Sequence, residues 1–189
     1  MEIEGIVLAA GFSSRACTYK MTLELGGKTV IEQCIEGMYD ICSRVIVVGG
    51  HRIEYLEFLL DKYSKIELVF NEKFEEGMFS SVKKGISCIR EERCFLIPGD
   101  YPLISRRVYE SMLEVDSDIV IPVYKHQRGH PVLMKKEAAI SLLRSPQYKN
   151  VRDFIHFRGF TPVVVEEEGI LFDIDTIEDY ETLKKKILN

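Results

Sequence analysis

Apolar residues along this chain fall into short continuous runs that are separated by segments of helical periodicity. Five of these runs are rich in Val, Ile and Leu and are short, which is typical of β-strands covered on both faces. We predict the strands at residues 3–9, 44–49, 66–70, 94–97 and 119–123.

Between and after these strands, apolar side chains recur every three or four positions, as in helices that bury one face. The first such helix carries Val30, Ile31, Cys34, Ile35 and Met38. Ser105 is a suitable N-cap for another, which carries Val108 and Met112. Further helices are predicted at 51–62, 78–89, 137–143 and 150–157, and a last one begins at Thr176.

Strands that alternate with helices as far as residue 123 predict an α/β fold. Its sheet should be parallel or mostly parallel, with right-handed crossovers and helices on both faces. Ligands of such sheets bind at the carboxyl ends of the strands. The length of 189 residues fits a single domain, 1–189.

The pattern changes after residue 123. Residues 124–134 contain Gly129 and Pro131 and predict a loop or irregular hairpin. Short strands are predicted at 160–165 and 170–172. The final helix should turn its apolar side inward, with Tyr180, Leu183 and Ile187.

Charge and hydropathy exclude several classes of function. The net charge of −5 argues against broad nucleic-acid binding, although local cations could still hold an anionic nucleotide. We expect neither a membrane span nor a signal peptide, because no long apolar stretch occurs and the amino terminus lacks a basic segment before an apolar one. The five cysteines form no C-x-x-C pair and are expected to be small buried side chains of a cytoplasmic protein.

The most informative segment is the small-residue loop after the first strand. Ala9, Ala10 and Gly11 leave the backbone bare, while Arg15 and Lys20 bring two cations into the same stretch. Bare N–H groups and cations suit a polyphosphate, whose leaving group gains charge as it departs. The glycine spacing fits neither a dinucleotide fingerprint nor a Walker A loop. An ordinary strand-to-helix turn is the alternative interpretation.

Two other segments carry acidic side chains with the chemistry of a metal site. Asp100, in the sequence P-G-D-Y-P, directly follows the fourth strand, where one carboxylate suits Mg²⁺. Asp173 and Asp175 project from the same side of an extended segment and repel one another unless a cation offsets their charge. A plain acid in a β-turn is the alternative for Asp100, and Thr176 and Asp179 are better explained as the cap of the last helix.

The loop resembles the pattern L-A-A-G-x-S-x-R-M-G-x-x-K, which opens the nucleotidyltransferases of the molybdenum-cofactor type, close to the molybdopterin cytidylyltransferases. Other stretches are similar to the family's G-D-x-P, D-x-D-T-P-E-D-Y, N-x-x-x-x-x-G-M-x-x-S and R-G-H-P-V-L segments. The matching positions include Leu8, Ala9, Ala10, Gly11, Ser13, Arg15, Lys20, Ser81, Asp100, Arg128, His130 and Asp175. The resemblance covers nearly the whole chain and implies a three-layer Rossmann-like nucleotidyltransferase fold.

The resemblance also implies roles for these residues. Arg15 and Lys20 would hold the β- and γ-phosphates and, with Asp100, would be catalytic. Asp100 and Asp175 would bind Mg²⁺, and the backbone of residues 9–11 would face the edge of the base. The other nucleotide-binding positions are Leu8, Ser13 and Ser81, and the acceptor-binding positions are Arg128 and His130. For Ser81, capping of the helix that follows is the alternative.

The implied reaction is the Mg²⁺-dependent transfer of a nucleotidyl group from CTP to a phosphorylated acceptor, molybdopterin, with release of pyrophosphate. Residues 1–123 would bind the nucleotide and 124–175 the acceptor, and a molybdoenzyme or its chaperone would be a protein partner. Two alternatives stay open. One is transfer to a sugar phosphate or another phosphorylated metabolite, and the other is a nucleotide-binding regulator without turnover.

The chain departs from the family's pattern in two places. Ala16 and Cys17 replace the usual Met and Gly, and a cysteine is strained if its position needs a positive φ. Residues 145–153 lack the glycines of the family's G-D-x-G-A-R run, so the acceptor half is less well matched than the nucleotide half. The motif leaves open whether Asp173 or Asp175 is the second metal ligand.

Overall fold

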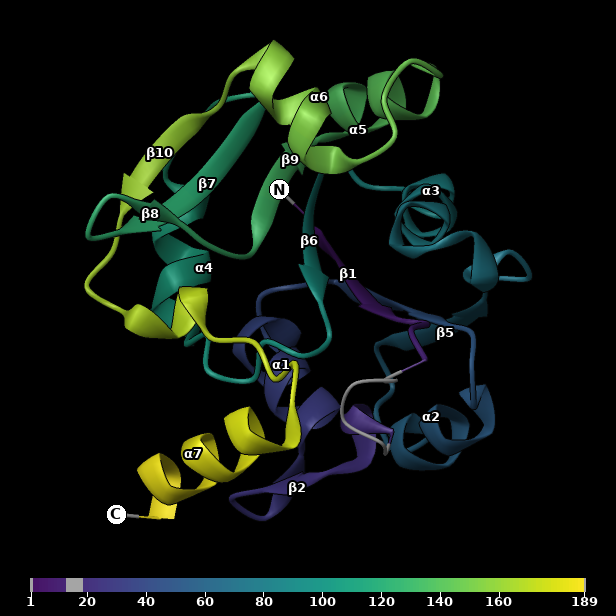
Figure 1. The fold of residues 1–189 in the computed structure, drawn as a ribbon. Coiled ribbons are helices and arrows are strands. Elements are labelled where there is room, and N and C mark those ends of the chain that lie inside the picture. Colours follow the sequence, from purple (N-terminus) through teal and green to yellow (C-terminus); the bar gives the residue numbers. More distant parts are fainter. Residues whose placement is uncertain (1, 13–18, 189) are drawn as a thin grey trace.

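The computed structural model of this chain describes residues 2–12 and 19–188. A sheet runs through its middle in the order β10-β7-β9-β6-β1-β4-β5, and a short strand β8 pairs with β7 (Figure 1). In chain order these strands are β1 (Glu4–Ala9), β4 (Arg44–Gly49), β5 (Ile66–Phe70), β6 (Arg93–Pro98), β7 (Ile119–Tyr124), β8 (Gln127–Arg128), β9 (Val132–Lys135) and β10 (Thr161–Val164). A separate hairpin joins β2 (Glu24–Leu25) to β3 (Lys28–Thr29).

Most of the sheet is parallel, as predicted. Strands β5, β4, β1 and β6 are parallel neighbours, and so are β7 and β10. Strand β9 is the exception within this path, because it runs antiparallel to both β6 and β7. The carboxyl ends of β1, β4, β5 and β6 therefore meet at one edge of the molecule.

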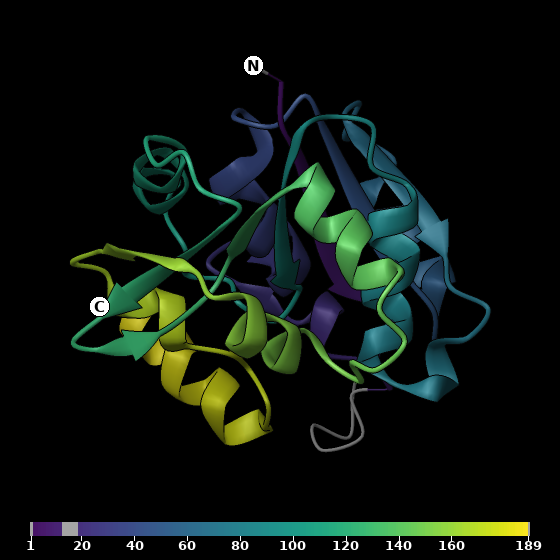
Figure 2. The ribbon, with the colours of Figure 1, turned by 90° about the horizontal axis from the view of Figure 1, so that it is seen from above.

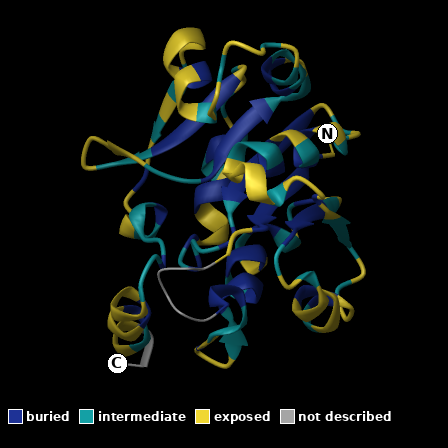
Figure 3. Cartoon of the chain, turned by 45° about the vertical axis from the view of Figure 1, so that its right-hand side comes forward, coloured by how far each residue is buried: buried dark blue, intermediate teal, exposed yellow. Residues whose placement is uncertain are grey.

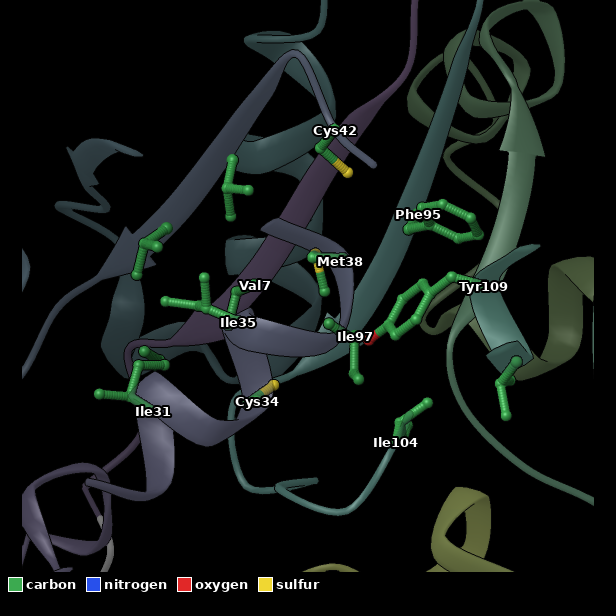
Figure 4. Close-up of a cluster of buried hydrophobic side chains, with 14 of the residues drawn as sticks. Val7, Ile31, Cys34, Ile35, Met38, Cys42, Phe95, Ile97, Ile104 and Tyr109 are labelled. Atoms are coloured by element: carbon green, nitrogen blue, oxygen red, sulfur yellow. The ribbon is translucent and has the colours of Figure 1, made fainter. Parts of the chain in front are cut away.

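Helices cover both faces of the sheet, which gives the expected three layers. One core packs the strands against α1 (Val30–Tyr39), α2 (Ile53–Leu60) and α4 (Arg106–Leu113), as Figure 4 shows in part. The other core packs them against α3 (Met78–Ser87), α5 (Lys136–Leu143) and α6 (Val151–Arg158) on the opposite face (Figure 2). Burial is concentrated in the strands, and exposed positions lie on the outer sides of the helices (Figure 3).

The sequence of β1 explains why both faces are covered. Val7 and Ala9 belong to the first core, whereas Ile6 and Leu8 belong to the second. Successive side chains of a strand point to opposite faces, so a continuous apolar run needs a core on each side.

The last helix, α7 (Ile177–Leu188), packs away from the sheet. Tyr180 and Leu183 form a third apolar cluster with Leu25, Val30 and Ile174. The hydroxyl of Tyr180 also donates to the carbonyl of Glu24 at 2.6 Å, which ties α7 to the β2–β3 hairpin. Tyr180 and Leu183 face inward as predicted, whereas the side chain of Ile187 lies outside the described part of the chain.

Residues 124–134 are more regular than the loop or irregular hairpin that the sequence suggested. A tight hairpin joins β7 to β8, and β9 then enters the sheet between β6 and β7. The strand was missed because Val132, Leu133 and Met134 form a very short apolar run directly after Pro131. Pro131 precedes the ladder, so the proline's missing N–H removes none of the hydrogen bonds of β9.

The strand predicted at 170–172 is wrong, because these residues belong mainly to a 3₁₀-helix, η4 (Glu168–Leu171). A Cβ placed on Gly169 would lie 2.2 Å from the carbonyl oxygen of Leu103, so the backbones pack directly together. The carbonyl of Ile170 accepts from the N–H of His130 at 2.9 Å. The segment therefore connects two loops instead of pairing as a strand.

Among the helices of residues 2–12 and 19–188, none combines the length and the apolar character that crossing a membrane would require.

Candidate active site

Three carboxylates meet at the carboxyl ends of the strands. One oxygen each of Asp100, Asp173 and Asp175 lies within 4.8 Å of the others. Asp100 follows β6, and the N–H of Gly99 donates to the carbonyl of Leu8 at 2.8 Å, so this turn is joined to the end of β1. The predicted meeting of two distant acidic segments is therefore present in the structure.

Local interactions fix the second acidic segment. The N–H of Ile174 donates to the carbonyl of Asp100 at 3.0 Å, and the Ile174 side chain is fully buried. The Asp179 carboxylate accepts from the N–H of Thr176 at 2.8 Å, and the N–H of Asp179 donates to the Thr176 hydroxyl at 3.1 Å. These reciprocal bonds form the predicted cap of α7, and the Thr176 hydroxyl lowers the pKa of Asp179.

Lys20 brings a cation to the same carboxylates. It opens a short 3₁₀-helix, η2 (Lys20–Thr22), and its Nζ lies 3.0 Å from Oδ2 of Asp100 and 3.4 Å from Oδ1 of Asp175. The Tyr19 hydroxyl donates to the carbonyl of Ala9 at 3.0 Å, which anchors the lysine to the end of β1. The other predicted loop residues with side-chain roles, Ser13 and Arg15, lie outside the described residues.

The electrostatics of the cluster favour a bound cation. Burial, followed by the charges of Asp100 and Asp175, raises the pKa of Asp173, and burial also raises the pKa of Tyr101 beside it. Oδ1 of Asp100 is buried and has no hydrogen-bond partner among the described groups. Hard oxygen donors that crowd together, one of them unsatisfied, fit a divalent ion such as Mg²⁺.

Two pockets share part of their lining, and the carboxylates line the smaller of them. The smaller, of about 300 Å³, is lined by Asp100, Asp173 and Asp175 together with Leu8 and Tyr101. The larger, of about 800 Å³, lies between the β7–β8 hairpin and the first turns of α3 and α6. Both are lined by Met78, Val82, His130, Val132 and Val151.

The end of β1 has the small residues that the sequence indicated. The carbonyls of Ala9 and Ala10 accept from the Tyr19 hydroxyl and the N–H of His51, so both peptides are held in place. Gly11 is exposed, and a Cβ built on it would meet nothing within 4 Å. Leu8 lines the smaller pocket. The roles of these four positions toward a nucleotide stay predictions.

Arg128 and His130 both line the larger pocket, and their binding of an acceptor stays a prediction. The guanidinium of Arg128 lies 4.4 Å from the centre of the Phe160 ring. The His130 ring stands edge-on to Tyr101 at 4.5 Å, and its Nδ1 has no hydrogen-bond partner among the described groups. Burial lowers the pKa of His130 to about 4, so the ring is neutral at pH 7.

Ser81 lies near the start of α3, as the sequence suggested. Its side chain is buried, and its hydroxyl accepts from Nδ2 of Asn71 at 3.0 Å. The N-cap of α3 is Gly77, whose φ of 96° suits glycine, so the alternative that a serine caps the helix is wrong. Ser81 holds the loop before α3 in place, and its contact with the nucleotide stays a prediction.

Several pocket residues were given no role in the site from the sequence, and three of them are polar side chains close to the predicted ones. Tyr101 lines the smaller pocket, and Asn150 and Arg152 line the larger one. Asn150 caps α6 by accepting from the N–H of Asp153 at 2.8 Å, which fixes the first turn of that helix. A cap can be predicted from sequence, but the pocket that its helix turn faces depends on how Phe154 and Ile155 of α6 pack into the second core.

Acidic side chains gather beside a small-residue loop at the carboxyl ends of parallel strands, an arrangement that suits the binding of a nucleotide with a divalent ion. Comparison with known proteins defines the class, that of the nucleotidyltransferases. The chain belongs to the family described as MobA-like NTP transferase domain, which matches residues 5–162.

Individual relatives span nearly the whole chain. The chain is 30% identical over 185 residues to the molybdenum cofactor cytidylyltransferase of Escherichia coli K12, covering 97% of this chain and 96% of that protein. A solved nucleotidyl transferase from Methanothermobacter thermautotroptrophicus has a TM-score of 0.87 at 21% identity, covering 99% and 98% of the two chains. A manganese complex of Rv0371C from Mycobacterium tuberculosis has a TM-score of 0.80 at 20% identity, covering 98% of each chain. These structures show the same Rossmann-like fold.

Proposed function

We propose that this protein transfers a cytidylyl group from CTP to a phosphorylated acceptor, molybdopterin, in a Mg²⁺-dependent reaction that releases pyrophosphate. The observation that carries the proposal is the meeting of Asp100, Asp175 and Lys20 at the strand ends. The name of the Escherichia coli relative, a molybdenum cofactor cytidylyltransferase, supports a cytidylyl group and an acceptor of the molybdenum-cofactor type. Residues 1–123 hold the nucleotide and 124–175 the acceptor, and a cytoplasmic molybdoenzyme or its chaperone receives the product.

On the nucleotide side, the chain supplies cations and bare backbone. Lys20 and Arg15 hold the β- and γ-phosphates and stabilise the leaving pyrophosphate. The backbone of residues 9–11 faces the edge of the base. Nζ of Lys20 lies 3.0 Å from Oδ2 of Asp100, which lines the smaller pocket, and this contact supports the arrangement.

Asp100 and Asp175 are the proposed ligands of Mg²⁺, and Asp173 lies close enough to replace or assist Asp175. When bound, the ion neutralises charge on the phosphate oxygens and orients them. The manganese bound by Rv0371C, which shares the fold, supports a divalent ion in this class of protein.

On the acceptor side, the larger pocket offers a mainly apolar wall with a few polar groups. A terminal phosphate of the acceptor attacks the α-phosphate of the nucleotide, and this phosphate is already a nucleophile, so no general base is needed. Arg128 and Arg152 supply positive charge at the pocket. His130, neutral at pH 7, contributes a hydrogen bond rather than a charge.

The proposal is tested in two steps. Thermal unfolding with CTP, GTP, ATP and UTP, each with and without Mg²⁺, should show the largest shift for CTP with Mg²⁺. Pyrophosphate release is then measured with molybdopterin and with a panel of sugar phosphates. Turnover with a sugar phosphate alone would identify the other acceptor class. Nucleotide binding without turnover on any acceptor would identify a regulator and contradict the proposal.

A further inference from the structure

The ammonium group of Lys20 contacts the same carboxylates to which the proposed function assigns the metal ion. Its Nζ is 3.0 Å from Asp100 and 3.4 Å from Asp175. The Lys20 side chain is only 10% exposed and that of Asp100 only 16%, so these charges interact with little screening by water. Lys20 thus offsets negative charge where three carboxylates converge.

A divalent ion and an ammonium group compete for such oxygens. Mg²⁺ takes its oxygen ligands at about 2.0–2.1 Å in a nearly octahedral arrangement. An ion bound to the oxygens that Lys20 contacts would therefore lie next to another positive charge and be repelled by it. Metal alone should bind weakly as long as the lysine keeps its place.

The lysine can leave the carboxylates without a change of fold. The backbone beside it is anchored, because the Tyr19 hydroxyl donates to the Ala9 carbonyl and Met21 is buried in the core. The four-carbon side chain of a lysine can turn about its own bonds, and its ammonium group can donate to phosphate oxygens in place of carboxylates. A triphosphate at the end of β1 would offer such oxygens.

We propose that the Lys20 ammonium group is an exchangeable occupant of the carboxylate cluster, so that the divalent ion enters together with the nucleotide and not alone. The triphosphate draws Lys20 away, and the same step opens Oδ2 of Asp100 and Oδ1 of Asp175, the two oxygens that Lys20 contacts, to the ion that accompanies the phosphates. This inference rests on the proposed function, because it takes the cluster as the metal site. It deepens that function by giving the two ligands an order of binding.

The test measures Mn²⁺ affinity in the absence of nucleotide, from the electron paramagnetic resonance signal of the free ion. Lys20→Met removes the charge and Lys20→Arg keeps it. Lys28→Met is the matched control, because Lys28 is exposed and pairs with Glu36 outside the site. We expect Lys20→Met to bind Mn²⁺ about tenfold more tightly than the wild type. The other two variants should bind it as weakly as the wild type.

Thermal stability gives a second measurement that does not depend on activity. Without Lys20 the carboxylates repel one another, so Lys20→Met should be less stable than the wild type in metal-free buffer. Mn²⁺ should then raise its unfolding temperature more than that of the wild type. If the Met variant does not fold, Lys20→Gln replaces it in both measurements.

The outcomes separate this inference from the proposed function. Addition of CTP or GTP to the wild type should raise its Mn²⁺ affinity at least to that of nucleotide-free Lys20→Met. If nucleotide binds but the nucleotide-free wild type and Lys20→Met have equal Mn²⁺ affinities, the exchange of Lys20 is overturned while the proposed function stands. Absence of nucleotide binding in every variant would overturn the proposed function as well.

Discussion

At the residue scale, the carboxylate of Asp100 is the central group of the site. Its Oδ2 accepts from Lys20 at 3.0 Å, whereas its Oδ1 is buried and has no partner among the described groups. A buried oxygen without a partner is unfavourable unless a ligand satisfies it. This position therefore suits a metal ligand better than an ordinary turn residue.

The variant Asp100→Asn should lower kcat for pyrophosphate release by about 10²-fold or more, because the neutral amide stabilises neither the ion nor the charge that develops on the phosphates. Asp40→Asn is the control, since Asp40 is an exposed acid paired with Arg106 and should tolerate the same change. Pyrophosphate release is measured for both under saturating substrates. Unchanged turnover in Asp100→Asn would rule out its role as a metal ligand.

Burial of His130 makes stability depend on pH. Its folded pKa of about 4 lies below the ordinary value of 6.5, so the unfolded chain takes up this proton first as the pH falls. The contribution of the neutral His130 ring to the unfolding free energy is complete above pH 6.5 and is lost as the pH falls toward 4. Between pH 7.5 and 5, the wild type should lose about 1–2 kcal/mol more unfolding free energy than His130→Gln. Urea unfolding at the two pH values measures this difference, and equal losses would show that the histidine is not buried as a neutral ring.

At the element scale, the cap of α7 links helix stability to the geometry of the site. Thr176 and Asp179 exchange hydrogen bonds across the first turn, and Asp179 also accepts from the N–H of Asp175 at 3.2 Å. The same carboxylate thus fixes both the helix start and the backbone of a proposed metal ligand. The cap of α1, formed by Thr29 and Glu32, has a similar geometry but lies outside the two pockets.

The two caps allow a matched comparison. Thr176→Ala and Thr29→Ala should each lower the unfolding free energy by about 1 kcal/mol, because each removes an N-cap. Only Thr176→Ala should also weaken Mn²⁺ binding in the presence of nucleotide, since it loosens the segment that carries Asp175. Chemical unfolding and Mn²⁺ titration distinguish the two effects. Equal Mn²⁺ affinity in the two variants would show that the cap of α7 does not influence the geometry of the metal site.

At the scale of the whole molecule, the two ends of the sheet carry different groups of charged residues. The carboxyl ends carry the candidate site, whereas the amino ends carry a buried ion pair. Glu4 is 1% exposed and accepts from Nε of Arg44 at 2.7 Å and from the N–H of Arg90 at 2.6 Å. Arg44 also donates to the carbonyl of Cys88 at 2.6 Å, and so joins β4 to the end of α3.

Arg44→Met should destabilise the protein by about 3–5 kcal/mol, because it leaves the buried Glu4 carboxylate without its cation. The double variant Glu4→Gln, Arg44→Met should recover part of this loss, since it removes the unpaired charge. The kcat of the folded fraction should not change in either variant, because the pair lies at the opposite end of the sheet. Denaturant unfolding measures the change in stability, and pyrophosphate release measures kcat. If the double variant lost the sum of the unfolding free energies lost by the two single variants, the pairing of Glu4 with Arg44 would be contradicted.

Much of the architecture could be predicted because its signals are local. The run at β1 needs a core on each side, and the cap at Thr176 depends only on residues three positions apart. Strand β9 was not predicted because a run of four residues is too short to show a periodic pattern. The helix η4 was not predicted because its conformation depends on contacts with Leu103 and His130. Short elements take their form from neighbours that the pattern does not show.

The sequence by itself determined which side chains could do the chemistry, since strand ends and residue types are visible in the order of the chain. Only the tertiary structure decided that Lys20 meets Asp175, 155 positions away, and that Ser81 turns into the protein toward Asn71. The physical reason is that hydrophobic periodicity fixes which face of an element is buried, but it does not fix which elements lie side by side. Contacts between distant segments follow from packing against a shared core, and here that packing joins the acidic segment before α7 to the turn after β6.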